Sequence, residues 1–376
     1  MEFWSIVEPT APLLHSLLHH SNTPFDRSGL SNSDIGEYVS IATEAGEALV
    51  RRASAGSIAE LDSIIFDIDG VLIDVSESVQ LVHRAAAEIY FRALGWTSCE
   101  NLIEPADVDA FKLAGGFNSD WELAYVWLLL YLFKSLRYGS ADGAVLKAAH
   151  PTMEEFAGDL AKRSGGPASA VDAIREMCRP GEWEAVEARW DRPKLQRIFV
   201  ELYAGDLCPE IYGFEPKLVT GPGLIRRDRP ILDRRFLPAS LKLGIATGRT
   251  AGETTVGLRL MGWSNLFPPH AVVSEGDGFQ KPDPGILSLA VQRLDAERPM
   301  YVGDTPDDLL TVRRYNEIGG EMLCCIVLTG PARRESGGKA RFAEQHADII
   351  ADNVNAALAA VQRCLGGALC QAEKRR

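Results

Sequence analysis

The sequence predicts an α/β protein, with a doubly wound, mostly parallel, Rossmann-like sheet and an α-helical domain inserted after the first strand. Two observations carry this prediction. Short apolar runs that end in polar or glycine-containing turns alternate with helical patterns along the last third of the chain. The stretch between the first and second of these runs is long and has the pattern of helices and loops. The 376 residues, 46% of them hydrophobic, suffice for a large core plus an insertion.

The predicted strands are short and apolar. They cover residues 63–66, 241–246, 271–273, 300–302, 324–328 and 348–350. Helical patterns between them cover residues 250–261, 285–294 and 307–315. Such alternation is typical of a doubly wound sheet, whose ligands bind beyond the carboxyl ends of the strands. The adjacent Cys324 and Cys325 are expected to be buried strand residues rather than redox partners.

The same patterns divide the chain into three regions. Residues 1–60 predict a helical extension without recognisable chemistry, with helices at 12–20 and 34–52. The α/β core is expected to comprise residues 61–75 and 236–376. The helical insertion, residues 76–235, contains helical patterns at 78–93, 121–135, 153–162 and 168–177. Connections at 74–76 and 237–240 would allow the insertion and the core to move relative to each other.

Composition narrows the classes of partner. A formal net charge of −13 argues against nucleic-acid binding, and the basic segment around 226–235 is expected to be a solvated loop. Seven irregularly spaced cysteines predict neither a disulfide framework nor a zinc site. The start of the chain lacks a basic leader, which favours a cytoplasmic location. The most apolar stretch, 123–133, is shorter than the ~20 residues of a membrane helix and predicts a buried helix without membrane insertion. Oligomeric state is left open.

Two aspartates directly follow the first apolar run. Asp67 and Asp69 come after Ile64-Ile65-Phe66. Side chains two residues apart can face one ligand at a strand end only if the chain turns, and Gly70 permits that turn. Paired carboxylates here indicate an acid/base or nucleophilic site. The simpler alternative is that both aspartates cap a helix.

A second acidic segment follows a later strand and contains Asp304 and Asp308. Gathering these carboxylates at one sheet edge is unfavourable, since each like-charge pair at 4 Å costs about 4 kcal/mol at an effective dielectric of 20. A bound cation removes that cost, and oxygen ligands without histidine or thiolate favour Mg²⁺. The predicted metal site comprises Asp67, Asp69, Asp304 and Asp308.

Two further segments offer groups for a phosphoryl oxygen. Thr247-Gly248-Arg249 follows a strand, with a hydroxyl and backbone N–H groups that suit hydrogen bonding to phosphate. Lys281 precedes a rigid turn at Pro282. Taken singly, the first segment is more often a plain turn and the second an exposed lysine. The ordered combination of all four segments is the specific signal.

These segments resemble the haloacid dehalogenase superfamily of phosphohydrolases. The resemblance rests on DxDGVLxD, the strand-terminal threonine, Lys-Pro and GDxxxD, which are Asp67, Asp69, Asp74, Thr247, Lys281, Pro282, Asp304 and Asp308. It covers residues 61–74 and about 236–355. The insertion corresponds in position to the helical cap of that family and is larger than usual for this branch.

The resemblance implies a Mg²⁺-dependent phosphatase for a small phosphorylated metabolite. Asp67 would be the nucleophile that forms an aspartyl-phosphate, and Asp69 the general acid and base. Thr247 and Lys281 would bind phosphoryl oxygens. Asp304 would ligate Mg²⁺ with Asp67 and the backbone carbonyl of Asp69, while Asp308 would hold a metal-bound water or orient the lysine. Gly70, Gly248 and Arg249 complete the substrate-binding set predicted for the core.

Substrate choice is expected to come from the cap. Residues 112–121 form a glycine-containing loop that leads into a helix, and Lys112, Asn118 and Trp121 are its candidate substrate-binding residues. The alternative is a plain helix start, with one of residues 118–120 as the cap and Trp121 in the apolar core. His83, on a cap helix, is expected to be a packed or surface residue.

The first motif also bears on which function within the superfamily is expected. Asp69 argues against the dehalogenating members, which lack it, and residues 68–71 differ from the Lys-Thr-Gly-Thr of transporting ATPases. Sugar-phosphate mutases keep the same core residues and are the nearest alternative. A non-catalytic protein that binds a phosphometabolite or another protein is a further alternative, although such a protein would not need Asp69.

Overall fold

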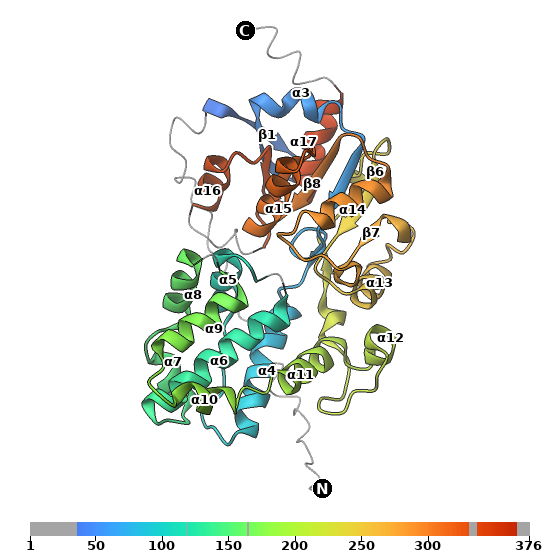
Figure 1. Ribbon diagram of the computed structural model, residues 1–376. Helices are drawn as coiled ribbons and strands as arrows, with labels where there is room; N and C mark the ends of the chain where they lie inside the picture. The colour runs from blue at the N-terminus through green and yellow to red at the C-terminus, as the bar shows by residue number, and fades with distance from the viewer. Residues whose placement is uncertain (1–35, 118, 164, 331–336, 367–376) are drawn as a thin grey trace.

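The computed structural model describes residues 36–117, 119–163, 165–330 and 337–366. These form an eight-stranded sheet with helices on both faces, and a group of helices beside it (Figure 1). The strand order is β1-β2-β10-β9-β8-β3-β6-β7. The strands are β1 (Tyr38–Thr43), β2 (Gly46–Arg51), β3 (Ser63–Phe66), β6 (Lys242–Ala246), β7 (Val272–Val273), β8 (Pro299–Gly303), β9 (Leu323–Val327) and β10 (Ile349–Ala351). All six strands predicted from apolar runs are confirmed.

Strand β3 is an interior strand, sixth of the eight in spatial order, and runs parallel to both neighbours. Its last residue, Phe66, pairs with Val302 of β8 and with Ile245 of β6. All four residues of β3 are buried, as expected for a parallel strand covered on both faces. The polar residues that follow these three strands therefore reach the same edge of the sheet.

Helices cover the two faces separately, which confirms the doubly wound arrangement. On one face Ile64 and Met300 pack with Leu358 of α17, and on the other Ile65 packs with Ile286 of α14. Cys325 and Cys324 of β9 are buried on these opposite faces as free thiols. The core helices are α3 (Ala55–Ile58), α13 (Ala251–Leu260), α14 (Gly285–Leu294), α15 (Pro306–Glu317), α16 (Gly338–Glu344) and α17 (Val354–Leu365).

The helix expected at 34–52 is wrong, because this segment forms the β1–β2 hairpin. Strand β2 pairs antiparallel with β1 on one side and with β10 on the other. Ala48, Leu49 and Val50 are all buried, so β2 lacks the alternation that marks a half-exposed strand. Pairing with β10, some 300 residues away, overrides the local helix preference. The helix expected at 12–20 lies outside the described residues.

The insertion is helical throughout most of its length and lies to one side of the sheet (Figure 1). All four of its predicted helices are confirmed, and the apolar stretch 123–133 lies in α6, where Leu128–Leu130 are fully buried. No described helix is long and apolar enough to cross a membrane. The helices are α4 (Val79–Ala93), α5 (Pro105–Ala114), α6 (Asp120–Tyr138), α7 (Gly143–Ala148), α8 (Met153–Lys162), α9 (Gly166–Met177), α10 (Glu182–Glu187), α11 (Arg192–Ala204) and α12 (Cys208–Tyr212).

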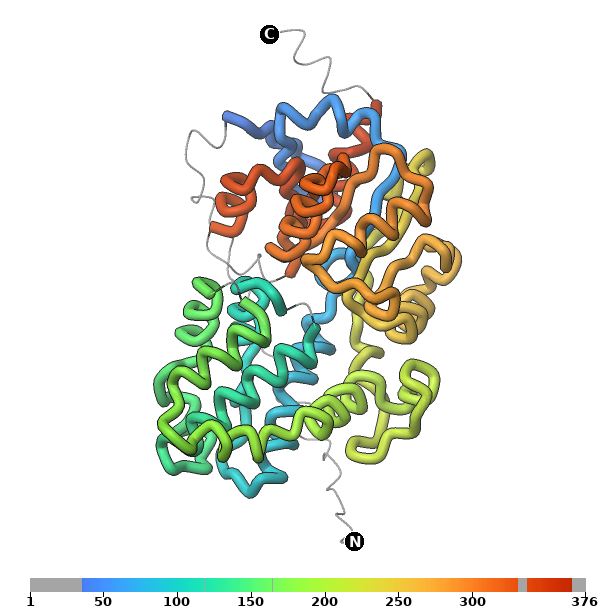
Figure 2. Tube along the Cα trace, in the orientation of Figure 1, coloured from blue at the N-terminus to red at the C-terminus, as the bar shows by residue number. Residues whose placement is uncertain are grey.

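The chain enters and leaves this helical cap at one place. Strand β4 (Ile73–Asp74) pairs antiparallel with β5 (Arg229–Pro230), and the two connections run together in Figure 2. Leu232 and Phe236 already pack in the apolar cluster of the sheet. The return crossing therefore lies at β5, ahead of the expected 237–240.

Single-turn 3-10 helices are η1 (Arg52–Ser54), η2 (Leu224–Arg227), η3 (Arg234–Phe236), η4 (Pro269–Ala271) and η5 (Glu275–Asp277).

The hairpin should contribute to stability through its buried face. Leu49, 7% exposed, lies between Ser40 of β1 and Ile350 of β10. We expect Leu49→Ala to lower the free energy of unfolding by about 2–4 kcal/mol, because it removes buried methyl groups and leaves a cavity. Chemical denaturation would measure this change. The control Ser40→Ala, at an exposed position, should stay within about 0.5 kcal/mol of wild type. Equal effects of the two substitutions would contradict a packed hairpin.

Candidate active site

Three strand ends bring the predicted polar residues to one edge of the sheet. Asp67 follows β3 and its backbone N–H donates to the carbonyl of Val302, 2.9 Å away, which continues the ladder between β3 and β8. Asp304 follows β8 and Thr247 follows β6. All three residues are buried. The parallel topology thus places side chains together that are up to 237 residues apart in sequence.

Lys281 lies at the centre of this group. Its Nζ is 2.8 Å from Oδ2 of Asp67 and 2.7 Å from Oδ1 of Asp308. It also donates to the hydroxyl of Tyr301 at 2.9 Å, and that hydroxyl in turn donates to Oδ1 of Asp308. Burial lowers the pKa of Lys281, but Asp308 and Asp67 outweigh it and raise the pKa well above its ordinary value. Lys281 is therefore a buried, charged lysine, and not the exposed lysine of the simpler alternative.

Asp308 is held by the start of helix α15. Its Oδ2 accepts hydrogen bonds from the backbone N–H of Asp304 at 3.1 Å and from both the backbone and the hydroxyl of Thr305 at 2.9 and 2.6 Å. Burial raises the pKa of Asp308, but Lys281 and these donors bring it below the ordinary value. Asp308 is thus an ionised carboxylate that fixes the lysine.

Asp304 is different, because its carboxylate is buried without a direct hydrogen-bond or ion-pair partner among the described residues, and the more distant charges of Lys112 and Lys281 do not offset its burial. Among the described residues it accepts no hydrogen bond and forms no ion pair, and burial together with Asp308 and Asp67 raises its pKa well above the ordinary value. Two glycines make room for it. A Cβ at Gly70, where φ is +73°, or at Gly330 would overlap Oδ2 of Asp304. The backbone is therefore shaped around a carboxylate that no cationic side chain contacts directly among the described residues.

The donor set fits a divalent cation. Ligand atoms of Asp67, Asp304 and Asp308 all lie within 4.8 Å of one another, and Lys281 balances one of their three negative charges. An isolated buried carboxylate is costly, and a cation with oxygen ligands such as Mg²⁺ would remove that cost. The carboxylate of Asp69, also predicted in the metal site, is not among these grouped ligand atoms. The family resemblance implies its backbone carbonyl as the ligand.

Asp69 is bound by Arg249 instead. Its Oδ1 accepts from Nε of Arg249 at 2.9 Å and from Nη2 at 2.5 Å. The same Nη2 is 3.0 Å from Oδ2 of Asp228, a fully buried carboxylate that also accepts from the hydroxyls of Ser78 at 2.5 Å and Tyr203 at 3.4 Å. The Asp69 side chain keeps 27% of its surface exposed, against 11% for Asp67.

Thr247 and the glycines line the same edge. The hydroxyl of Thr247 accepts from the backbone N–H of Arg249 at 3.3 Å, which forms a tight turn after β6, and Gly248 in that turn is exposed. The backbone N–H of Gly70 donates to the carbonyl of Ile73 at 2.8 Å. The carbonyl of Gly70 accepts from the hydroxyl of Thr329. Gly248 therefore leaves its part of the turn open to a ligand.

The cap contributes Lys112 to this region. Its Nζ is 3.0 Å from Oδ1 of Asp120, and the charges of Asp120 and Asp69 outweigh burial and raise the pKa of Lys112. The Asp120 carboxylate also meets Nε2 of His83 at 3.2 Å. His83 is buried and neutral, since burial lowers its pKa, and its Nδ1 accepts from Trp127. His83 is therefore a packed residue, as predicted.

The loop that follows Lys112 contacts the core directly. The backbone N–H of Gly116 donates to Oδ2 of Asp307 at 2.8 Å, and Arg341 of α16 donates to the carbonyl of Leu113 at 3.1 Å. Trp121 is partly buried against the apolar cluster of the cap, and Ser119 at the N-cap of α6 makes no side-chain capping hydrogen bond. Asn118 lies outside the described residues.

The sequence did not predict that several further residues belong to this site. Asp228 stands in the basic segment 226–229, which indicated a solvated loop, and its arginine neighbours are indeed exposed or half-exposed. Tyr301 is the middle residue of an apolar strand, where an aromatic side chain is ordinary. Tyr203 lies within an unpredicted helix, α11. None carries a local signal, because each acquires its role from a partner that is distant in sequence.

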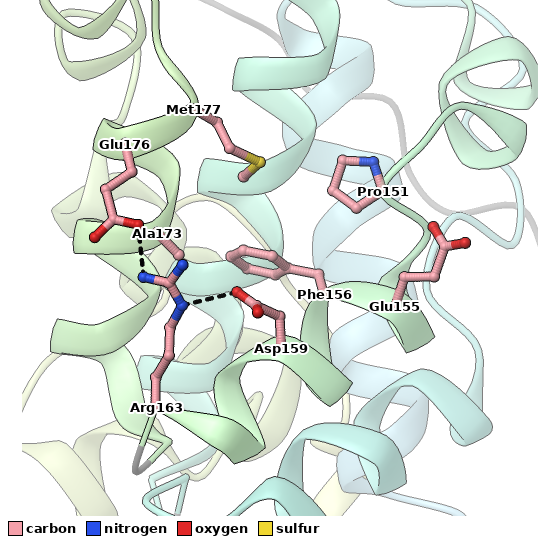
Figure 3. A pocket seen from close by; sticks show the side chains of 8 residues that line it. All are labelled: Pro151, Glu155, Phe156, Asp159, Arg163, Ala173, Glu176 and Met177. Carbon is pink, nitrogen blue, oxygen red and sulfur yellow. Dashed lines mark hydrogen bonds and ion pairs between the residues drawn. The ribbon is translucent and has the colours of Figure 1, made fainter.

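A separate hollow of about 360 Å³ lies within the cap, between α8 and α9. Figure 3 shows Arg163 reaching from one helix toward Asp159 and Glu176, at 2.8 and 2.7 Å, over an apolar floor that includes Phe156 and Met177. None of the predicted site residues lines it. The hollow is thus distinct from the carboxylate cluster at the sheet edge.

Several known proteins resemble this chain in sequence or in fold. A relative from Phytophthora nicotianae named imidazoleglycerol-phosphate dehydratase is 24% identical over 258 residues, which are 69% of this chain and 42% of that protein. The chain therefore spans less than half of the length of that relative. Among solved structures, a phosphatase from Thermococcus thioreducens, Tt82, is 27% identical with a TM-score of 0.47, covering 70% of this chain and 91% of that one.

The X-ray structure of a structural-genomics target has a TM-score of 0.54 at 16% identity and covers 81% of this chain and all of that chain, a likeness of fold alone. The profile of the haloacid dehalogenase-like hydrolases matches residues 61–315, the span that contains every strand-terminal carboxylate described above. On this match over most of its length, with the fold and the ordered motifs in agreement, the chain belongs to the haloacid dehalogenase-like hydrolases.

Proposed function

We propose that this hydrolase is a Mg²⁺-dependent phosphatase that acts on a small phosphomonoester through an aspartyl-phosphate on Asp67. One observation carries the proposal. Lys281 contacts Asp67 at 2.8 Å, and the buried carboxylate of Asp304 lies beside them, with Asp69 two residues further on. In this proposal a nucleophile, a cation site and a proton donor would share one sheet edge, which suits phosphoryl transfer because its chemistry is mostly positioning and charge stabilisation.

The first step forms a bond between a carboxylate oxygen of Asp67 and phosphorus. The bond between phosphorus and the ester oxygen breaks, and that oxygen keeps the electron pair and takes a proton from Asp69. The greater exposure of the Asp69 side chain, 27% against 11% for Asp67, suits a group that must reach a leaving group. Splitting the hydrolysis in this way replaces one difficult step with two easier ones.

The second step consumes water. Asp69, now a carboxylate, accepts a proton from a water molecule that attacks phosphorus, and the bond to Asp67 breaks to release phosphate. Lys281 stays beside Asp67 through both steps and offsets the charge that returns to it. The hydroxyl of Thr247 and the backbone of the exposed turn at Gly248 would hydrogen-bond phosphoryl oxygens.

Asp67, Asp304 and Asp308 would hold the Mg²⁺. What the cation supplies when bound is positive charge that faces the phosphoryl oxygens and offsets the three carboxylates. Lys112 is the residue of the cap proposed to face the substrate, since its ammonium lies within electrostatic range of Asp69 and Asp304. The contact between Gly116 and Asp307 closes the cap loop over this edge, which would exclude bulk water.

Replacement of the nucleophile tests the phosphatase proposal. We expect wild type to release phosphate from 4-nitrophenyl phosphate with Mg²⁺, and Asp67→Asn to lower kcat/KM by about 10³-fold or more, because the amide cannot form the acyl phosphate. Phosphate and nitrophenolate release would both be measured. The matched control is Asp172→Asn, which changes an exposed carboxylate on α9 and should keep full activity. Retained activity in Asp67→Asn would contradict the proposal.

The same assay separates hydrolysis from the mutase alternative. A panel of phosphomonoesters that includes sugar phosphates and imidazoleglycerol phosphate, the compound in the name of the Phytophthora relative, should yield free phosphate. Formation of isomeric sugar phosphates without phosphate release would favour a mutase. Binding of panel members without any turnover would favour a non-catalytic protein.

Removal of the Asp304 carboxylate tests the metal site. We expect Asp304→Asn to weaken Mg²⁺ binding by at least about tenfold, since even partners of metal ligands contribute 10–100-fold. The same substitution should raise the melting temperature of the metal-free protein, because it relieves repulsion between buried carboxylates. Titration calorimetry and thermal denaturation with and without chelator would measure these effects, with Asp172→Asn as control. Equal Mg²⁺ affinity in wild type and Asp304→Asn would exclude this site.

A further inference from the structure

Carboxylates occupy two of the three nitrogens of the Arg249 guanidinium, and the third is buried. Nε and Nη2 both point at Oδ1 of Asp69, and Nη2 also meets Asp228. The remaining nitrogen, Nη1, is buried and has no hydrogen-bond partner among the described residues. The side chain is 4% exposed. Direct contact with a phosphoryl oxygen, the role expected from the sequence, is therefore less favourable than a role that acts through Asp69.

The position of the guanidinium is fixed on two sides. On one side Asp228 is anchored by the hydroxyls of Ser78 and Tyr203. On the other side helix α13 presents Gly257, and a Cβ there would lie 2.6 Å from Nη1. A glycine in mid-helix destabilises the helix by about 1 kcal/mol relative to alanine. At Gly257 the missing side chain leaves room for the guanidinium of Arg249.

We propose that Arg249 is a positioning residue for Asp69. It holds Oδ1 with two N–H groups so that Oδ2 is presented to the leaving-group oxygen, and Asp228 and the space at Gly257 hold the guanidinium in place. The inference rests on the proposed phosphatase function. In the first step, Oδ2 gives its proton to the ester oxygen as the bond to phosphorus breaks. Arg249 itself neither gains nor loses a proton.

Leaving groups of different basicity provide the test. A strongly basic alkoxide needs the proton from Asp69 as it departs, whereas 4-nitrophenolate departs without it. We expect Asp69→Asn to lower kcat/KM about 10²–10⁴-fold for an alkyl phosphate and only a few fold for 4-nitrophenyl phosphate. Arg249→Met should follow the same pattern, with a loss of about 10–100-fold for the alkyl ester and a few fold for the aryl ester.

A second variant leaves the arginine in place. Gly257→Ala should still fold, because the helix preference of alanine offsets part of the cost of moving the guanidinium, and should selectively lower kcat/KM for the alkyl phosphate by about 3–10-fold. The matched control is Gly158→Ala in α8, where a Cβ would meet nothing within 4 Å. This control should leave the ratio of the two kcat/KM values unchanged.

The outcomes separate this inference from the function on which it rests. If Asp69→Asn lacks leaving-group selectivity, the acid role of Asp69 in the proposed function fails. If Asp69→Asn is selective while Arg249→Met loses activity equally on both esters, Arg249 binds phosphate and the positioning role is overturned. Selective loss in both Arg249→Met and Gly257→Ala would establish it.

Discussion

Three buried carboxylates gathered beside one lysine are the constraint on which the rest of this structure depends. Asp67 and Asp308 contact Lys281, and a ligand atom of Asp304 lies within 4.8 Å of theirs, so carboxylates crowd a poorly solvated place and the pKa of Asp304 is raised. Such crowding opposes folding and persists only where the surrounding structure enforces it. Here the enforcement comes from fully buried parallel strands and from the first turn of α15, neither of which can relax without loss of the core.

The environment gives each carboxylate a different character. Asp308 is saturated with donors and serves as a fixed counter-charge. Asp304 has no donor among the described side chains and is the member that most needs a cation. Asp69 stands apart, paired with Arg249 and more accessible. Chemically identical groups thus acquire separate tasks from burial and hydrogen bonding alone, as is common where acid/base and metal chemistry share one site.

Local sequence pattern was sufficient to predict the parallel strands and the polar residues that follow them, but not the β1–β2 hairpin or Asp228. Asp67, Thr247 and Asp304 were predictable because each follows a short apolar strand, and parallel strands bring such positions together. The β1–β2 hairpin was not, because β2 is buried between two strands and its partner β10 is distant in sequence. The role of Asp228 was not predictable for a related reason. Its basic neighbours in sequence indicate an exposed loop, whereas Arg249, Ser78 and Tyr203 enclose it only in the folded chain.

The antiparallel pair of β4 and β5 has a consequence for how such a chain changes over time. The two ends of the helical insertion pair with each other in β4 and β5, so the sheet can keep its arrangement whatever the length of polypeptide between them. A longer insertion adds little to the entropic cost of closing the loop, which grows only with the logarithm of length. The helical insertion can therefore have grown, shrunk or been exchanged while the carboxylate cluster at the sheet edge kept its geometry, and a large insertion on an ordinary α/β core is what such freedom produces.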